Sequence, residues 1–280
     1  MKKTALVTDS TADLPADFAR EHNIKIVPLR VFFGEEEYRD GLDIKPREFY
    51  QRLREKDELP SSSQPSPDDF VSVYQELLKD YQEIISVHLS SSLSGTINAA
   101  NIAREKVQGA IHIFDSYTVS LGIGLQIREA VKFIQKGSST RQVLEHLQKV
   151  RDNSATYFTL DTLKYLYMGG RISRARSLMG SILRIKPILQ LVPDGVAPAG
   201  RARNKKQLIN EVVKKFKNEA GNREAGGLAV AHGDAPEMAQ KMQATLEEAF
   251  SIKTSFFGEI GPTLGVHSGP GVVGICMFFR

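Results

Sequence analysis

The chain has 280 residues, of which 41% are hydrophobic and 25% are charged, values typical of a folded globular protein with room for two domains. A single cysteine, Cys276, excludes an internal disulfide and fits a reducing environment. The sequence has no uncharged apolar run near the roughly 20 residues of a membrane-spanning helix, and its start does not match a secretory signal. We therefore expect a cytoplasmic protein that is not an integral membrane protein.

The net charge of +4 is unevenly distributed. Residues 164–217 contain 13 Lys and Arg but only 2 Asp and Glu, so this segment carries +11 and the remainder carries −7. This segregation predicts a basic face on a mildly acidic body. Because no aromatic–basic interleaving or nucleic-acid motif accompanies the charge, we expect no nucleic acid partner. A small anionic ligand or an acidic protein surface explains the charge equally well.

Apolar runs alternate with helical patterns through the first half of the chain. We expect strands at residues 4–8, 24–27, 84–89, 111–115 and 156–160, and helices near 46–53, 70–78, 97–103, 125–135 and 140–151. Strands that alternate with helices of this length predict a doubly wound, largely parallel sheet.

From about residue 165 the pattern changes. Pro193-Asp194-Gly195 is a hairpin signal between apolar runs, and helices are expected at 207–218 and 238–250. The basic segment 174–184 is expected to form an amphipathic helix, and 261–271 a glycine-rich turn. The sequence therefore predicts a two-domain α/β protein, with an N-terminal α/β domain at 1–164 and a C-terminal α+β domain at 165–280.

Two polar turns follow predicted strands. The turn Ser90–Thr96 leads into a helix, where free backbone N–H groups, neutral hydroxyls and the flexible Gly95 suit an anion. A serine-rich turn that caps its own helix is an equally good interpretation. Asp9 ends the first strand, where ligands gather in open α/β sheets, but it also suits the capping of the turn that follows. The loop at 59–70 contains three prolines and is expected to be stiff.

Several short motifs occur in order along the chain. They are residues 7–15 (Val-Thr-Asp-Ser-Thr-Ala-Asp-Leu-Pro), 62–66 (Ser-Ser-Gln-Pro-Ser), 91–96 (Ser-Ser-Leu-Ser-Gly-Thr), 169–173 (Gly-Gly-Arg-Ile-Ser), 200–206 (Gly-Arg-Ala-Arg-Asn-Lys-Lys) and 267–271 (His-Ser-Gly-Pro-Gly). As an ordered set they resemble the DegV family, the fatty-acid-binding proteins that serve the bacterial fatty acid kinase.

The resemblance implies that a long-chain fatty acid, such as palmitate or oleate, is held between the two domains. It implies that Ser62, Ser94 and His267 bind the carboxylate, although the family commonly has threonine where this chain has Ser62. It further implies a carrier without turnover of its own, which presents the acid to a separate kinase for phosphorylation to an acyl phosphate used in phospholipid synthesis.

The basic segment has two interpretations beside this resemblance. Arg171, Arg174, Arg201 and Arg203 can dock the kinase or contact the acyl phosphate, or they can form an ordinary solvated face. We expect no cofactor beyond the bound fatty acid, and no metal, because the sequence has no His/Cys cluster with ligand spacing.

Two other classes of function compete with the carrier. A serine-dependent lipid or ester hydrolase would use Ser94, His267 and Asp9, but Leu93-Ser94-Gly95 lacks the Gly-x-Ser-x-Gly nucleophile motif. A nucleotide-binding enzyme would need a phosphate-binding motif such as Gly-Lys-Ser/Thr, which the serine turn lacks.

Overall fold

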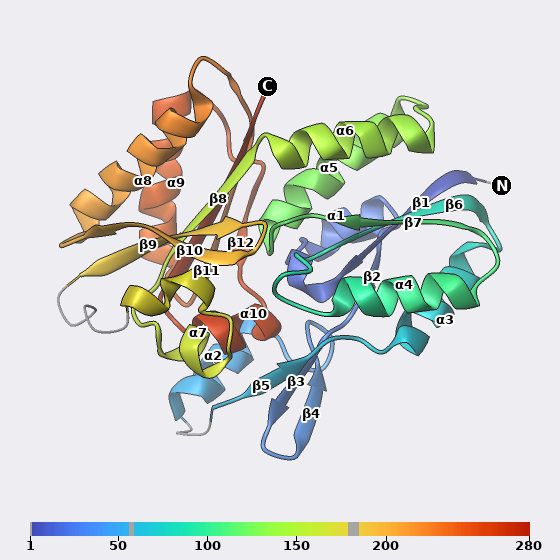
Figure 1. The fold of residues 1–280 in the computed structure, drawn as a ribbon, viewed down its shortest axis with the longest axis horizontal. Helices are drawn as coiled ribbons and strands as arrows, with labels where there is room; N and C mark the ends of the chain where they lie inside the picture. Colours follow the sequence, from blue (N-terminus) through green and yellow to red (C-terminus); the bar gives the residue numbers. More distant parts are fainter. Residues whose placement is uncertain (1, 56–58, 179–184) are drawn as a thin grey trace.

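The computed structural model describes residues 2–55, 59–178 and 185–280. The chain folds into two α/β bodies that lie side by side, with a small third sheet beneath them (Figure 1). The two-domain α/β fold class expected from the sequence is confirmed.

The N-terminal body is built on a four-stranded parallel sheet of order β2-β1-β6-β7. Alternate strand residues point to opposite faces, and both faces are apolar, so both are covered by helices. Helices α3 and α4 cover one face, and α1, α5 and α6 cover the other. The strands are β1 (Lys2–Asp9), β2 (Lys25–Val27), β6 (Tyr81–His88) and β7 (Ala110–Asp115), and the helices are α1 (Ala16–Glu21), α3 (Pro67–Leu77), α4 (Thr96–Lys106), α5 (Leu121–Gln135) and α6 (Thr140–Asp152).

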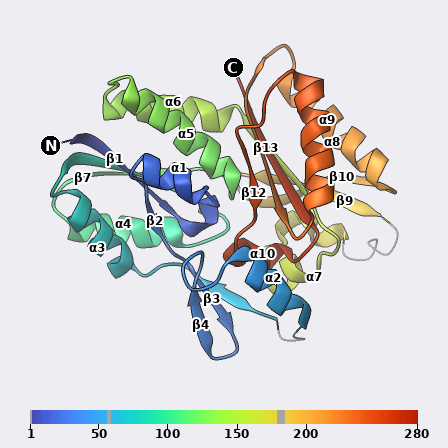
Figure 2. The same cartoon turned by 180° about the vertical axis from the view of Figure 1, so that it is seen from behind.

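The C-terminal body is built on a six-stranded mixed sheet of order β10-β9-β8-β13-β11-β12. Helices α8 and α9 cover its outer face, as the view from behind shows (Figure 2). Its inner face packs toward α5 and α7. The elements are β8 (Ser154–Thr159), α7 (Lys164–Met168), β9 (Lys186–Val192), β10 (Gly195–Ala202), α8 (Lys205–Ala220), β11 (Ala225–Gly233), α9 (Pro236–Phe250), β12 (Phe256–Glu259) and β13 (Val272–Phe279).

Strand β8 belongs to this second sheet, where it pairs with β9 and β13. It precedes residue 164, the end of the N-terminal domain expected from the sequence. The first strand of the C-terminal sheet therefore comes from the segment directly after α6, before the expected domain boundary.

A small antiparallel sheet, β4-β3-β5, packs against α2. It consists of β3 (Arg30–Phe33), β4 (Glu36–Arg39) and β5 (Ser61–Ser63), with α2 at Pro46–Glu55. The prediction of a stiff loop over 59–70 is wrong for its first part, which forms strand β5 and pairs with β3. Three serines show no hydrophobic periodicity, so this strand results from the tertiary fold rather than from a local pattern. This pairing fixes the position of Ser62.

The segment 261–271, expected to be a glycine-rich turn, is instead largely the helix α10 (Pro262–Ser268). Its glycines reflect close packing, since a Cβ at Gly265 would lie only 2.5 Å from Phe49 of α2. Two short 3-10 helices complete the fold, η1 (Ser10–Ala12) and η2 (Ser173–Leu178). Of the amphipathic helix expected over 174–184, residues 179–184 lie outside the described residues. Across the described ranges, we find no helix with the length and apolar character needed to cross a membrane.

Candidate ligand-binding site

A cavity of about 440 Å³ lies between the two bodies, within the usual range for a small-molecule site. Its residues come mainly from the inner face of the six-stranded sheet, from α10, from the N-terminus of α5, from β5 and from the loop that follows β6, with others from α7 and the segment after it. Most of the lining is apolar, and Arg171 carries the one formal charge among the described lining residues.

Small side chains on the inner face of the sheet create this space. Ala229, Ala231 and Gly274 line the cavity, and Gly274 pairs in register with both Ala231 and Phe158. The intervening residues of the same strands are large and pack under α8 and α9: Leu228, Val230 and Val273. The sequence analysis missed these residues, although the alternation of small and large side chains along β11 and β13 is a signal that could have found them.

At one end of the cavity, β5 brings Ser62 to His267 of α10. Ser62 Oγ lies 2.8 Å from His267 Nε2, at hydrogen-bonding distance. Burial, with a smaller contribution from the Arg171 guanidinium, lowers the pKa of His267 to about 4. The imidazole is therefore uncharged at neutral pH, and the pair offers neutral hydrogen-bonding groups.

Ser94 lies in the turn between β6 and α4 and also lines the cavity. Its hydroxyl accepts a hydrogen bond from Thr96 N–H at 3.3 Å and lies 2.9 Å from Thr96 Oγ1. Ser94 therefore satisfies a backbone N–H in the first turn of α4 and also faces the cavity, and its binding of an anion stays a prediction. Gly95 allows the loop after β5 to approach, since a Cβ there would lie 2.0 Å from Gln64 Oε1.

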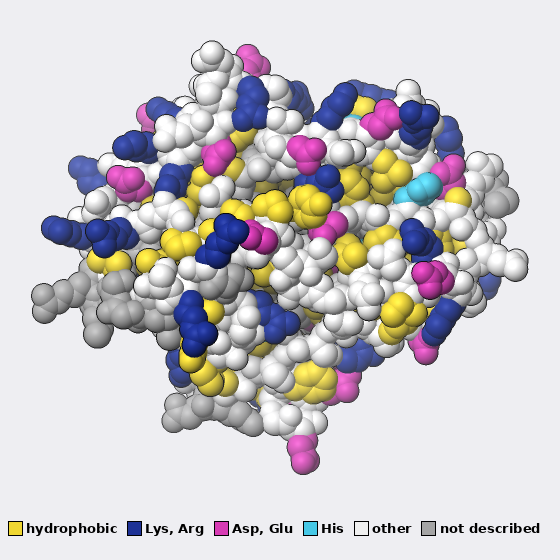
Figure 3. Space-filling view, viewed as in Figure 1, with side chains coloured by type: hydrophobic (Ala, Val, Ile, Leu, Met, Phe, Trp, Pro, Cys, Tyr) yellow, Lys and Arg dark blue, Asp and Glu magenta, His cyan; other side chains and the backbone are white. Residues whose placement is uncertain are grey.

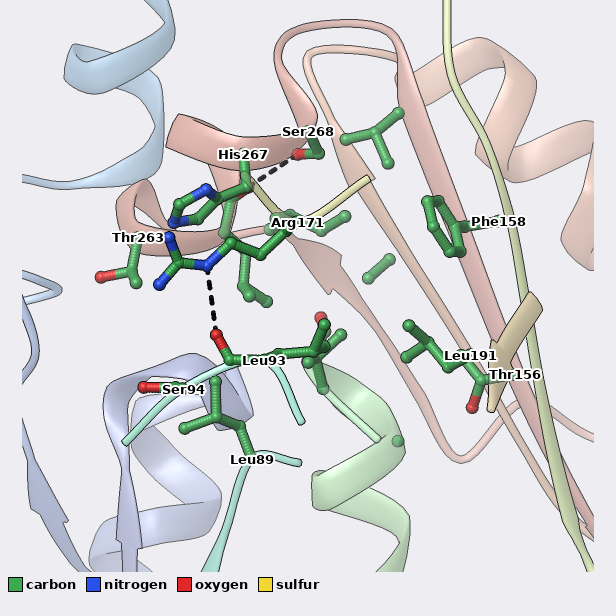
Figure 4. Close-up of a pocket in the computed structure, with 18 of the residues that line it drawn as sticks. Leu89, Leu93, Ser94, Thr156, Phe158, Arg171, Leu191, Thr263, His267 and Ser268 are labelled. Carbon is green, nitrogen blue, oxygen red and sulfur yellow. Dashed lines mark hydrogen bonds between the residues drawn. The ribbon is translucent and has the colours of Figure 1, made fainter. Parts of the chain in front are cut away.

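Arg171 connects the two bodies at the same end of the cavity. Its Nε donates to Leu93 O of the serine turn at 3.2 Å, and its Nη1 donates to Gly169 O at 2.7 Å. Figure 4 shows Arg171 between His267 and the turn that carries Leu93 and Ser94. Leu191, Phe158 and Thr156 lie on the opposite side of the cavity in this view. The site is therefore polar at one end and mainly apolar elsewhere.

Gly169 has a role beyond ending α7. A Cβ at this position would lie 2.3 Å from His267 Nδ1, so the imidazole occupies space that only a glycine leaves open. His267 Nδ1 is buried and has no hydrogen-bond partner among the described residues. The motif at 169–173 thus supplies both the space for His267 and, through Arg171, the charge beside it.

The other three arginines expected at the site lie away from the cavity. Arg174 forms an exposed ion pair with Asp194. Arg201 and Arg203 are exposed on and just after β10, where they line a separate surface hollow with Gln207. Lys and Arg side chains gather over β9, β10 and α8, at the left of the space-filling view (Figure 3).

The three residues of the hydrolase alternative are not brought together as a triad. His267 is paired with Ser62 rather than Ser94, and Asp9 accepts from Thr11 N–H and Leu89 N–H. Asp9 Oδ2 also lies 2.8 Å from His88 Nδ1, and His88 Nε2 lies 2.6 Å from Ser86 Oγ.

This second constellation has the order of a Ser-His-Asp triad, but Ser86, His88 and Asp9 all have zero exposure and none lines the cavity. Of the two interpretations of Asp9, capping is the one the structure bears out, since its carboxylate accepts from the turn that follows β1. In the described parts of the chain, we find no group of three or more His, Cys, Asp or Glu residues that could hold a metal ion.

Comparison with known proteins gives concordant results. The model of the DegV family, described as uncharacterised proteins, matches residues 3–280. A DegV domain-containing protein of Clostridium acetobutylicum is 36% identical over 281 residues, which cover 99% of each chain.

Two solved structures are also similar over nearly the whole chain. A DegV family protein from Thermus thermophilus, described as fatty acid binding, is 33% identical with a TM-score of 0.94 and covers 99% of this chain and 100% of its own. A stearic-acid-binding protein from Eubacterium ventriosum is 27% identical with a TM-score of 0.91, covering 99% of this chain and 98% of its own.

Proposed function

The chain belongs to the DegV family, and from this premise we propose that it binds a long-chain fatty acid in the cavity between its two bodies. The observation that carries the proposal is the cavity itself, which joins a long apolar wall to a cluster of neutral polar groups at one end. The descriptions of the proteins from Thermus thermophilus and Eubacterium ventriosum as fatty-acid-binding support it.

The apolar wall supplies most of the binding free energy in this proposal. Each CH₂ group moved from water into an apolar site contributes about 0.8 kcal/mol, so a chain of 16 to 18 carbons, such as palmitate, oleate or stearate, gains far more from burial than its head group does. The small residues Ala229, Ala231 and Gly274 leave the room that such a tail needs.

Ser62, Ser94 and His267 receive the carboxylate at the polar end. A buried carboxylate needs donors that replace its water, and hydroxyls can donate without forming a permanent ion pair. Arg171 adds a positive charge nearby, while two of its N–H groups already donate to backbone carbonyls. The charge of Arg171 therefore neutralises the head group in part.

We further propose that the protein has no turnover of its own and presents the bound acid to a separate fatty acid kinase, which converts the carboxylate to an acyl phosphate for phospholipid synthesis. Arg171 lies close enough to the polar end to contact the acyl phosphate. Arg174, Arg201 and Arg203 belong to the exposed basic surface, which suits an acidic surface on the kinase.

Mass spectrometry of an organic extract from the purified protein tests the binding role. We expect about one long-chain fatty acid per chain, and its loss from a Ser62→Ala/Ser94→Ala double variant that remains folded. If the folded wild-type protein yields no fatty acid and takes up neither palmitate nor oleate, the proposal is wrong. Transfer to the kinase is tested separately, by acyl phosphate formation with the purified kinase and ATP, using Arg201→Ala and Arg203→Ala.

A further inference from the structure

Helix α10 is the short element on which the polar end of the cavity depends. It carries Thr263, Leu264 and His267, all of which line the cavity. With seven residues it makes too few helical hydrogen bonds to be stable alone, so its position depends on tertiary contacts, including those at its start.

Two acidic side chains from the N-terminal half meet the start of α10. Gly261 N–H donates to Asp13 Oδ1 at 2.9 Å, across a sequence separation of 248 residues. A Cβ at Gly261 would lie 2.7 Å from Asp13 Oδ1 and 3.3 Å from Asp40 Oδ1. The two carboxyl groups therefore lie on the same side of Gly261, within about 6 Å of each other, and only glycine fits against them.

Each carboxyl group is held by hydroxyls rather than by a cation. Ser120 Oγ donates to Asp13 Oδ2, and Ser10 Oγ donates to Asp40 Oδ2 at 2.8 Å. Across the described ranges, neither acid forms an ion pair with a Lys, Arg or His. The other titratable groups that act on this region are Asp9 at the end of β1, which has the same charge, and Tyr50 of α2, which is itself buried.

The backbone on both sides of this contact is unusual. Asp13 has φ 49° in the left-handed region, and Ser120 has φ 53° and ψ −145°, which non-glycine residues rarely adopt. Such conformations persist only where the surrounding contacts require them, and they concentrate at functional sites. Here both residues are turned so that the hydroxyl and the carboxyl meet under the start of α10.

Two neighbouring acids without a cation do not both ionise readily. Burial is the main reason that the pKa of Asp13 is raised well above its ordinary value of 3.8, and the charge of Asp40 adds to the effect. Burial also raises the pKa of Asp40, which is 3% exposed, while polar contacts with Thr263 and Ser10 offset part of the rise.

We propose that Asp13 and Asp40 are positioning residues that hold one proton between them, and that this proton fixes the start of α10 and so places His267 at the ligand carboxylate. The inference rests on the proposed function in one respect, that the ligand is a fatty acid. When the pair loses its proton, the two carboxylates repel each other beside Gly261, so Asp13 and Asp40 move apart and the start of α10, which is bonded to Asp13, shifts with them. Fatty acid affinity then falls as the pH rises.

The first test compares the wild-type protein with Asp40→Asn, which imitates the protonated acid with almost the same shape. We expect the wild-type affinity for palmitate to fall as the pH rises and the pair loses its proton, by at most about tenfold for each unit of pH. Asp40→Asn should show little of this fall and bind more tightly than wild type at pH 9. Because both proteins are measured with the same ligand at each pH, the ionisation of palmitate itself cancels.

Asp43→Asn is the matched control, since Asp43 is an exposed acid three residues away that is paired with Arg39. It should keep the wild-type pH profile. A purely structural role for Asp40 would lower affinity by the same factor at every pH and leave the profile unchanged, and that result would overturn the proposal. Asp13→Asn provides a second variant if Asp40→Asn does not fold.

A second measurement on the ligand-free protein keeps this inference separate from the proposed function. The NMR signal of the His267 ring, assigned by comparison with His267→Gln, should shift with a midpoint well above its own pKa of about 4, and this shift should be absent from Asp40→Asn. If wild type binds no fatty acid but the His267 signal shows this titration, the carrier proposal is wrong and the proposal of a proton held by Asp13 and Asp40 is supported. If the ring signal titrates identically in both proteins, the shared proton is wrong.

Discussion

Replacement of Gly274 by leucine should close the fatty acid cavity without unfolding the protein. Gly274 lies in β13 between Ala231 and Phe158, and both of these neighbours face the cavity. A Cβ at Gly274 would have no heavy atom within 4 Å, so a larger side chain projects into open space. The change therefore acts on the ligand rather than on the core.

The expected magnitude follows from the tail that leucine displaces. Its four side-chain carbons occupy the room of about four CH₂ groups, and each contributes about 0.8 kcal/mol when buried, so the loss is about 3 kcal/mol. This corresponds to a dissociation constant for palmitate that is roughly two orders of magnitude higher. Gly274→Ala should lower the binding free energy by less than the contribution of about one CH₂ group, which corresponds to a dissociation constant at most roughly fourfold higher. It should also stabilise the ligand-free protein by about 0.5 to 1 kcal/mol, because glycine is unfavourable inside a strand.

Calorimetric titration of delipidated protein with palmitate measures the effect, and thermal unfolding without ligand checks the fold. The series Gly274→Ala, Gly274→Val and Gly274→Leu should show a graded loss of affinity without loss of stability. Val273→Ala is the matched control on the opposite face of the same strand, where it should lower stability but leave affinity unchanged. If folded Gly274→Leu binds palmitate as tightly as wild type, the tail does not lie along this face of the sheet and the reasoning is wrong.

Three further predictions concern the polar end of the cavity. Ser62→Ala should weaken palmitate binding by roughly 10- to 150-fold in calorimetry, since a hydrogen bond to a charged group contributes about 1.5–3 kcal/mol. Ser61→Ala, at an exposed position, is the control and should keep the wild-type affinity. If Ser62→Ala binds palmitate as tightly as wild type, Ser62 does not contact the carboxylate. Gly169→Ala should weaken binding but keep the circular dichroism spectrum, because its Cβ would displace His267; an unchanged affinity would contradict this contact. The lowered pKa of His267 implies that the free energy of unfolding falls as the pH drops from 6.5 toward 4. Urea unfolding at a series of pH values should show this decline in wild type but not in His267→Gln. If the free energy of unfolding depends on pH in the same way in both proteins, the pKa of His267 is not lowered.

The layers of the fold could be predicted from the sequence because periodic apolar runs determine them. The parallel sheet, its covering helices and the β9–β10 hairpin all lie near their expected residues. Strand β5 could not be predicted in this way, since Ser61–Ser63 has no apolar pattern and its pairing with β3 is a tertiary contact. Likewise the glycines of α10 indicated a turn, whereas they permit a helix to approach Phe49 and Tyr165 closely.

Some polar residues of the cavity were expected from the sequence, but their arrangement was not. Ser62, Ser94 and His267 all line the cavity, yet they were proposed from a family resemblance, and no spacing along the chain indicates that Ser62 meets His267. Arg171 was expected to contact the kinase or the acyl phosphate, or to lie on a solvated face, and it lines the cavity, where Gly169 and Leu93 accept its hydrogen bonds. Such contacts depend on how the two bodies meet, which local patterns do not encode.

The polar end of the cavity must reconcile retention of a fatty acid with access to its carboxylate. Arg171 donates two of its five N–H groups to the carbonyls of Leu93 and Gly169, and these two bonds fix the position of its charge at the cavity. In the proposed carrier, this charge attracts the carboxylate from a fixed position, and we expect the hydroxyls of Ser62 and Ser94 to make the direct contacts. The tail then determines how long the ligand stays bound, so the residence time should lengthen with each added CH₂ until the cavity is filled. The reactivity of the carboxylate with a kinase should be the same for all tails that fit. Laurate, myristate and palmitate compared in one exchange assay separate these two quantities, and a residence time that does not depend on tail length would mean that the head group, not the sheet face, holds the ligand.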